Sequence, residues 1–216
     1  MRRITNVRFP KPLNSSKESD LWQISFAENE CISDIQPMIS ETVIPSESWD
    51  GDWISPMGID LQINGGLGLA FNELKEKDLP QLFELLEHLW ADGIEAICPT
   101  IVTCEINDLR QALLTLQNAR KQSLPQQCEL LGAHLEGPFI AKEKRGAHPL
   151  EKICSPSLSE LEKRISGFEN DIALMTIAPE LSGSFDLISK LLDLEIIVSL
   201  GHSTAAMSGL VTRAEN

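Results

Sequence analysis

From about residue 56 onward, short apolar runs alternate with longer stretches in which apolar residues recur at helical spacing. Apolar runs of this length, closed by Gly, Pro or polar residues, are typical of buried strands. The predicted strands are 59–63, 94–100, 129–133, 172–178 and 196–200. Strands that alternate with helices indicate a parallel sheet joined by crossover helices. The fold class predicted for this part of the chain is therefore α/β.

The intervening helices are preceded by residues suited to capping. Asp78 is the predicted N-cap of a helix over 79–90, and Asn107 that of the next helix. Ser157-Leu158-Ser159-Glu160 has the spacing of a capping box. Further helices are predicted over 185–192 and from Ser203 through Val211. His88 lies in the first helix, far from other motif residues, and is predicted to be structural or solvent-facing.

Residues 1–55 form a different zone, which is predicted to be a small β-rich segment. Apolar and polar residues alternate in 21–26 and in 31–35, with Asn29 between them, and this pattern favours a β-hairpin. An isolated hairpin is only marginally stable, so it must pack against further structure. The predicted domains are 1–55 and 56–216.

Polar residues that are candidates for a functional site follow the predicted strands. They are Gln62 and Asn64, Glu136, Glu180 and His202. In a barrel of alternating strands and helices, the carboxyl ends of the strands form one rim, where active sites assemble. Each residue alone also has a structural interpretation: Asn64 sets up a turn, Glu180 starts a helix, and His202 bonds to backbone. Their shared position favours a site.

Glu136 lies where an apolar run meets a Gly-Pro pair. A buried carboxylate is costly unless a cation, a proton or hydrogen bonds compensate it, and neighbouring His134 offers a second group able to bind metal. A hydrogen-bonded structural Glu136 is the alternative. The connection over 137–157 is longer than most loops of this kind and is predicted to be functional, although its charge run 142–145 is expected to be a solvated face.

Composition narrows the function classes. The net charge of -14 and pI near 4.7 argue against nucleic-acid and membrane-surface partners, which require basic faces. Five cysteines without a C-x-x-C motif favour free thiols in a reducing compartment. No apolar segment follows the basic N-terminus, and no run is long enough for a membrane span, so the predicted location is the cytoplasm.

The motifs occur in a recognisable order. H-L-E-G-P-F at 134–139, R-G-A-H-P at 145–149, T-I-A-P-E at 176–180 and S-L-G-H-S at 199–203 follow the first-strand string M-G-I-D-L-Q-I-N-G-G at 57–66. In order and approximate spacing, they resemble the N-acetylglucosamine-6-phosphate deacetylases of the amidohydrolase superfamily, over about residues 50–216. The resemblance implies an incomplete TIM-like (β/α) barrel of about five strands, with residues 1–55 contributing to a small β-sandwich.

The resemblance also implies a set of site residues. Glu136 and His202 match metal ligands of the family, and Ala147 and His148 match positions that contact the amino sugar. Gln62 and Asn64 stand where many amidohydrolases carry H-x-H. Because amides are poor ligands by comparison, one divalent metal ion is expected rather than two, and zinc is the expected metal.

The implied reaction is metal-dependent hydrolysis of the N-acetyl amide of N-acetylglucosamine 6-phosphate, giving glucosamine 6-phosphate and acetate. No catalytic residue is expected in this chain: the general acid/base Asp, the third metal ligand and the phosphate-binding residues are expected beyond residue 216, so that the chain is the N-terminal part of an enzyme. Whether the complete enzyme forms a homodimer stays an open question. Two alternatives stay open: an amidohydrolase for a cyclic amide or acylated amino acid, and a non-catalytic metal- or partner-binding remnant.

Overall fold

The computed structural model describes residues 2–10, 21–38, 46–122 and 124–205. The chain divides into two compact units, Met1–Met57 and Gly58–Asn216. Within the described ranges, no helix is both long and apolar enough to cross a membrane. The cysteines Cys31, Cys98, Cys104, Cys128 and Cys154 are free thiols, as predicted.

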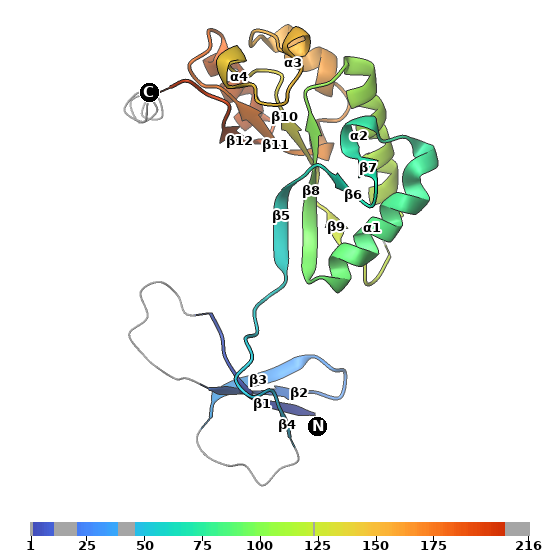
Figure 1. Ribbon diagram of the computed structural model, residues 1–216, viewed down its shortest axis with the longest axis vertical. Helices are drawn as coiled ribbons and strands as arrows, with labels where there is room; N and C mark the ends of the chain where they lie inside the picture. The colour runs from blue at the N-terminus through green and yellow to red at the C-terminus, as the bar shows by residue number, and fades with distance from the viewer. Residues whose placement is uncertain (1, 11–20, 39–45, 123, 206–216) are drawn as a thin grey trace. The chain divides into compact units, whose positions relative to one another are not determined.

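The first unit is a four-stranded sheet (Figure 1). Its strands are β1 (Arg3–Val7), β2 (Trp22–Phe26), β3 (Ile32–Pro37) and β4 (Glu47–Ser48). They lie in the order β3-β2-β1-β4, with β4 parallel to β1 and the other pairs antiparallel. The predicted hairpin is confirmed as β2 and β3. Ile4 and Val7 of β1 and Ile24 of β2 form the small buried core of the first unit.

The second unit alternates strands and helices, as the sequence pattern predicts (Figure 1). Its strands are β5 (Gly58–Ile63), β6 (Gly65–Gly66), β7 (Leu69–Ala70), β8 (Ile94–Val102), β9 (Glu129–Leu130), β10 (Ala133–Glu136), β11 (Ile172–Ile177) and β12 (Ile197–Leu200). Its α-helices are α1 (Leu79–Ala91), α2 (Ile106–Arg120), α3 (Leu158–Ile165) and α4 (Ser184–Asp193). Strands β12-β11-β10-β8-β5 pair in parallel in that order and curl into part of a barrel. The five-stranded partial barrel is therefore confirmed.

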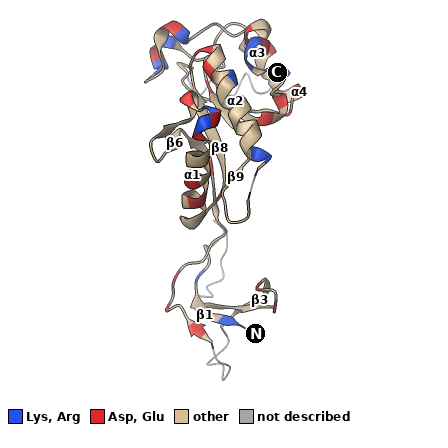
Figure 2. Cartoon of the chain, turned by 90° about the vertical axis from the view of Figure 1, so that its right-hand side faces the viewer, with Lys and Arg blue, Asp and Glu red and all other residues tan. Residues whose placement is uncertain are grey.

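The core of this unit lies between the sheet and its helices. Leu82 of α1, Leu113 of α2 and Leu187 of α4 are fully buried, as are Ile97 of β8 and Met175 of β11. Burying each such side chain contributes about 1.5–3 kcal/mol. Acidic and basic residues both occur along α2, α3 and α4 (Figure 2).

The two outermost strands of the partial barrel expose apolar side chains. Ile59 and Leu61 of β5 are 56% and 54% exposed, and Ile197 and Leu200 of β12 are 66% and 52% exposed. A closed barrel would pair both edges, whereas β5 and β12 each have one sheet neighbour among the described strands. These strands therefore leave an incompletely covered apolar surface.

The predicted helix caps have different outcomes. Asp78 is the N-cap residue of α1, as predicted, but its carboxylate accepts a hydrogen bond from the backbone N–H of Lys75 (3.0 Å) in the preceding turn and none from α1. The predicted cap Asn107 is wrong. Asn107 lies inside α2, which follows Glu105. The Ser157 hydroxyl does cap α3, by accepting from the N–H of Glu160 (3.2 Å). His88 is exposed, and the helix predicted from Ser203 through Val211 falls largely outside the described residues.

The strand predicted over 129–133 is divided in two. Leu131 and Gly132 separate β9, which pairs with β8, from β10, which lies between β8 and β11. Gly132 has φ +147°, and a Cβ atom there would lie 2.9 Å from the backbone nitrogen of Ala173. The chain therefore needs glycine at this close approach, and all of β10 after it is buried.

Candidate metal centre

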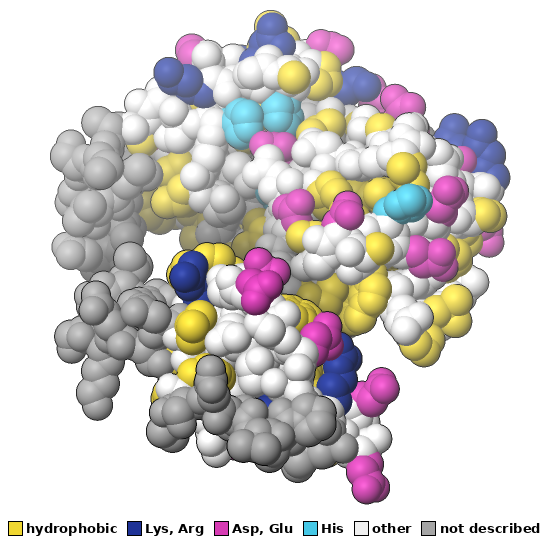
Figure 3. Space-filling model, turned by 60° about the horizontal axis from the view of Figure 1, so that its bottom comes forward, with side chains coloured by type: hydrophobic (Ala, Val, Ile, Leu, Met, Phe, Trp, Pro, Cys, Tyr) yellow, Lys and Arg dark blue, Asp and Glu magenta, His cyan; other side chains and the backbone are white. Residues whose placement is uncertain are grey.

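Three groups able to bind metal meet at the carboxyl end of the sheet. They are the carboxylate of Glu136 and the imidazoles of His148 and His202, whose ligand atoms all lie within 4.8 Å of one another. Glu136 is the last residue of β10, His202 follows β12, and His148 lies in the long loop after β10. Figure 3 shows histidine side chains gathered beside acidic ones at the surface of the molecule.

His202 is held at both ring nitrogens. Its Nε2 lies 2.9 Å from Oε1 of Glu136, and its Nδ1 lies 2.7 Å from the backbone carbonyl oxygen of Lys144. The backbone of His202 has φ +51°, a left-handed conformation that is uncommon for a residue other than glycine. Burial lowers the pKa of His202, but the hydrogen bonds to Lys144 and Glu136 outweigh it, so that this pKa is raised above its ordinary value.

His148 is more deeply buried, with a side chain only 5% exposed. Its Nε2 lies 3.9 Å from Oε2 of Glu136, and its ring meets that of His202 edge to face at 4.8 Å between centroids. On the other side of the ring, Nδ1 contacts the hydroxyl of Thr103 (2.8 Å). Burial lowers the pKa of His148, which favours the neutral imidazole.

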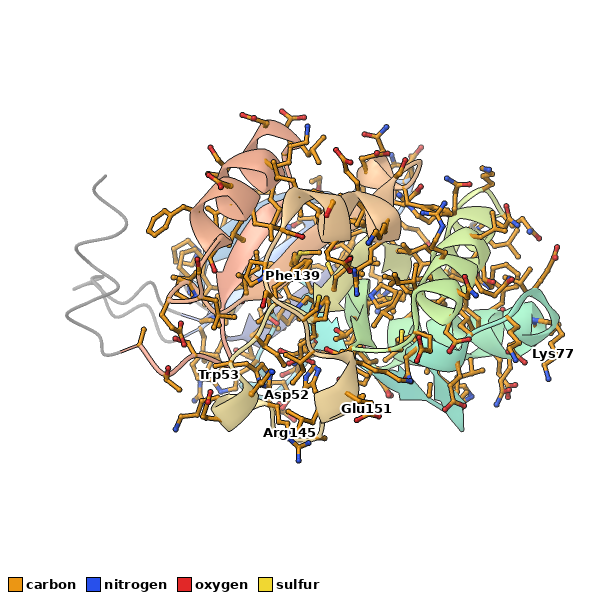
Figure 4. All side chains as sticks on the ribbon, turned by 90° about the horizontal axis from the view of Figure 1, so that it is seen from above. Asp52, Trp53, Lys77, Phe139, Arg145 and Glu151 are labelled. Carbon is orange, nitrogen blue, oxygen red and sulfur yellow. The ribbon has the colours of Figure 1, made fainter. Side chains whose placement is uncertain are left out.

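Two hydrogen bonds to backbone carbonyl oxygens hold the loop that carries His148. The guanidinium of Arg145 donates to the carbonyl oxygen of His148 (2.7 Å), and the N–H of Ala141 donates to the carbonyl oxygen of His202 (2.9 Å). Figure 4 shows Phe139 inside the unit and Arg145 at its periphery. The loop is thus fixed to the end of β12, and its service to the site stays a prediction.

Gly137 lets this loop pass close to Thr103. It has φ +85°, and a Cβ atom there would lie 2.2 Å from the Thr103 hydroxyl oxygen. A side chain would therefore displace Thr103 and the histidine that it contacts.

The remaining predicted site residues are placed differently. The side-chain amide of Gln62 donates to Oε1 of Glu136 (3.2 Å), which joins β5 to the cluster. Asn64 lies exposed after β5, and its backbone carbonyl oxygen accepts from the N–H of Phe71 (3.0 Å). Ala147 is exposed in the loop beside His148.

His134 and Glu180 do not join the cluster. The ring nitrogens of His134 contact the hydroxyls of Thr100 (3.1 Å) and Thr176 (2.8 Å) inside the sheet, so its expected contribution of a second metal-binding group beside Glu136 is wrong. It lies two residues before Glu136, which places it on the same face but about 6.6 Å deeper. The Glu180 carboxylate instead accepts from the Ser203 hydroxyl (2.6 Å) and the Thr204 N–H (2.6 Å).

Two contacts of the cluster were not predicted. Thr103 directly follows β8 and is 5% exposed, and the carbonyl oxygen of Lys144 belongs to a stretch interpreted only as a solvated charge run. Thr103 could have been found, because it is a polar residue at a strand end like the others. A backbone carbonyl carries no signal in the sequence.

Comparison with known proteins identifies the relatives of this chain. It is 37% identical over 155 residues to N-acetylglucosamine-6-phosphate deacetylase of Bos taurus, a match that covers 70% of this chain and 37% of the relative. The same enzyme of Bacillus subtilis is 34% identical over 172 residues, covering 79% of this chain and 42% of the relative. The chain is homologous to these deacetylases.

The structure agrees with this relationship. A crystal structure of N-acetylglucosamine-6-phosphate deacetylase from Pasteurella multocida has a TM-score of 0.71 and 25% sequence identity, over 99% of this chain and 54% of that one. No family profile matches the chain. The chain spans about two fifths of the length of the curated deacetylases that it matches.

Proposed function

We propose that this chain supplies the metal-binding part of an enzyme that hydrolyses the N-acetyl amide of N-acetylglucosamine 6-phosphate to glucosamine 6-phosphate and acetate. The observation that carries the proposal is the meeting of Glu136 and His202 at the carboxyl end of the sheet. The homologous deacetylases support the substrate class.

The residues present fit a divalent ion. An oxygen of Glu136 and Nε2 of His202 face each other, and carboxylate and imidazole are both ligands of zinc, the metal that we propose. The other ring nitrogen of His202 donates to the Lys144 carbonyl, and metal-binding histidines are oriented by outer bonds of this kind. When bound, the ion would supply Lewis acidity, which polarises an amide carbonyl and makes water more acidic.

The other residues act around this pair. Gln62 donates to the Glu136 carboxylate and thereby restricts its orientation. In the proposed site, His148 faces the same space and offers a hydrogen bond to a sugar hydroxyl or to the amide carbonyl, with exposed Ala147 beside it. Gln62 and Asn64 supply amides rather than imidazoles, which supports a single ion.

The proposed location is the cytoplasm. Five free thiols are in keeping with a reducing compartment. Amino-sugar phosphates are the proposed substrates.

A chimera tests the proposed reaction. The chain is joined to the rest of the barrel of a homologous deacetylase, loaded with zinc, and assayed for acetate release from N-acetylglucosamine 6-phosphate. Acetate should be released, and Glu136→Gln should abolish its release while circular dichroism confirms the fold. A folded chimera that retains zinc but releases no acetate from this substrate would exclude the proposed reaction.

A further inference from the structure

The register of β11 and β12 determines which side chains meet beyond the ends of these two strands, which lie side by side (Figure 1). Ile177 of β11 pairs with Leu200 of β12. Glu180 and Ser203 each lie three residues beyond this pair, and parallel strands advance by the same distance per residue. Glu180 is therefore brought level with Ser203, the residue that directly follows His202.

The carboxylate of Glu180 holds both residues that follow His202. Its Oε2 accepts a hydrogen bond from the Ser203 hydroxyl (2.6 Å), and its Oε1 accepts from the N–H (2.6 Å) and the hydroxyl (3.0 Å) of Thr204. The Ser203 oxygen accepts in turn from the N–H of Ala205 (2.9 Å). One side chain thus ties together the backbone over 203–205.

The turn that presents Glu180 is itself fixed. The N–H of Ala178 donates to the carbonyl oxygen of Phe139 (2.9 Å), and the hydroxyl of Ser184 donates to the carbonyl oxygen of Ala178 (2.9 Å). Ser184 is fully buried at the start of α4. Because its turn is anchored in this way, Glu180 restrains the residues that it contacts rather than following their motion.

His202 requires such a restraint. Its φ of +51° is left-handed, and a residue other than glycine keeps this conformation only where its surroundings hold it there. Lys144 and Ala141 hold the ring and the carbonyl group of His202 itself, whereas Glu180 holds the chain directly after it. If the chain after His202 relaxed, Nε2 would move away from Oε1 of Glu136.

Glu180 acts through His202 rather than as a ligand. Among the residues that the structure describes, the possible metal ligands that gather here are Glu136, His148 and His202, and Glu180 is not one of them. We propose that Glu180 is a positioning residue, which fixes the backbone after His202 and so holds the imidazole where it binds the metal. The inference rests on the proposed function for the role of His202.

Two substitutions at Glu180 separate its hydrogen bonds from its charge. Glu180→Ala removes all three bonds, so the zinc affinity of the 216-residue chain should fall at least about tenfold, as for other outer partners of a metal ligand. Glu180→Gln keeps an oxygen for Thr204 and an N–H group for Ser203, so its affinity should stay within about threefold of the unchanged chain. Isothermal titration measures both, with circular dichroism confirming the fold. Equal losses in the two variants would overturn the proposal.

The matched control is Glu169→Ala. The carboxylate of Glu169 also accepts from a backbone N–H, that of Gly167 (2.9 Å), but it lies directly before β11, at the opposite end of the sheet. This variant should bind zinc like the unchanged chain, and an affinity as low as that of Glu180→Ala would refute a specific role of Glu180.

A second variant tests the same contacts with Glu180 in place. Ser203→Ala combined with Thr204→Val removes both hydroxyl groups from the Glu180 carboxylate, and neither residue is buried, so the fold should persist. Zinc affinity should fall at least about threefold. An unchanged affinity would overturn the proposal even if Glu180→Ala failed to fold.

Proton NMR of the zinc-free chain separates this inference from the proposed function. The Nδ1 proton of His202 is held by the carbonyl oxygen of Lys144, which can only accept, and His202→Gln assigns its signal by absence. The signal should persist in Glu180→Gln and Glu169→Ala and be lost to solvent exchange in Glu180→Ala. A folded Glu180→Ala chain with an unchanged signal would overturn the inference. Absence of zinc binding in the unchanged chain, with the expected NMR pattern, would count against the metal centre and still support the positioning of His202.

Discussion

The Nδ1 atom of His202 lies 2.7 Å from the backbone carbonyl oxygen of Lys144, which precedes it by 58 residues. One side-chain hydrogen bond therefore joins the end of β12 to the loop that carries His148. A second bond, from the N–H of Ala141 to the carbonyl oxygen of His202, fixes the same two segments (2.9 Å). The orientation of the ligand and the path of the loop depend on each other.

Metal binding should require Glu136 and His202 but not His148. We expect one zinc ion per chain, with affinity reduced more than about 100-fold in Glu136→Gln or His202→Ala, beyond the usual effect of an outer partner. His148→Ala and the exposed control His88→Ala should bind zinc like the unchanged chain. Isothermal titration and metal analysis after dialysis measure this. Two zinc ions retained per chain would contradict the single site.

Gln62 should act as an outer partner of the metal centre. Its amide donates to Oε1 of Glu136, so Gln62→Leu frees the carboxylate to rotate, and zinc affinity should fall about tenfold. The matched control is Gln122→Leu, because Gln122 is also exposed and its amide bonds only to the carbonyl oxygen of Asn118 (3.3 Å) among the contacts described. Equal affinities of the two variants, measured by competition with a chelating dye, would show that Gln62 does not orient Glu136.

Gly137→Ala should destabilise the fold more than Gly93→Ala, which places alanine at a backbone of the same conformation. Gly137 and Gly93 both have φ +85°. A Cβ atom added at Gly137 would lie 2.2 Å from the Thr103 hydroxyl oxygen, whereas one added at Gly93 would have no atom within 4 Å. Gly93→Ala therefore measures the conformational cost, about 1 kcal/mol, and Gly137→Ala adds a steric cost of about 1–3 kcal/mol. Urea unfolding gives both values, and identical midpoints would show that the loop yields without cost.

Stability should fall as the pH is lowered through the ordinary histidine range. Burial lowers the pKa of His134 below its ordinary value of 6.5, although the charge of Glu136 opposes this. Below about pH 6.5 the unfolded chain takes up a proton that the folded chain refuses, so stability is lost until the pH passes the lower folded pKa. His134→Gln should reduce this loss. Urea unfolding at several pH values tests it, and an equally steep loss in the variant would assign the effect to other groups.

The outermost strands should make residues 1–216 associate when they are produced alone. Ile59 and Ile197 are exposed on β5 and β12, so we expect binding of hydrophobic dyes and oligomers at micromolar concentration. Ile59→Lys combined with Ile197→Lys should reduce both. Leu192→Lys on α4 is the control, because Leu192 is 61% exposed but lies on a helix. Sedimentation velocity measures the oligomers, and a monomer that binds no dye would contradict this view.

Periodicity in the sequence predicted the strands and helices that carry the site, because the pattern of apolar residues along the chain shows which face of a strand or helix is buried. Glu136 and His202 could be proposed from their positions at strand ends and from the resemblance. The error at His134 has a physical reason: a period of two residues gives the face of a strand but not the depth along it. The contact with the Lys144 carbonyl and the position of His148 depend on the path of a loop, which side-chain identity does not encode.

The pairing of Glu136 with His202 also bears on how the chain reaches its folded state. These residues lie on β10 and just after β12, and β11 lies between the two strands. Their contact closes a segment of 66 residues, for which the entropy of loop closure opposes assembly by roughly 4 kcal/mol. Pairing of β10, β11 and β12 offsets this cost, so we expect the two metal ligands to come together only when these strands are paired. We therefore expect the ability to capture a metal ion to be acquired late in folding, after the adjoining strands are in register.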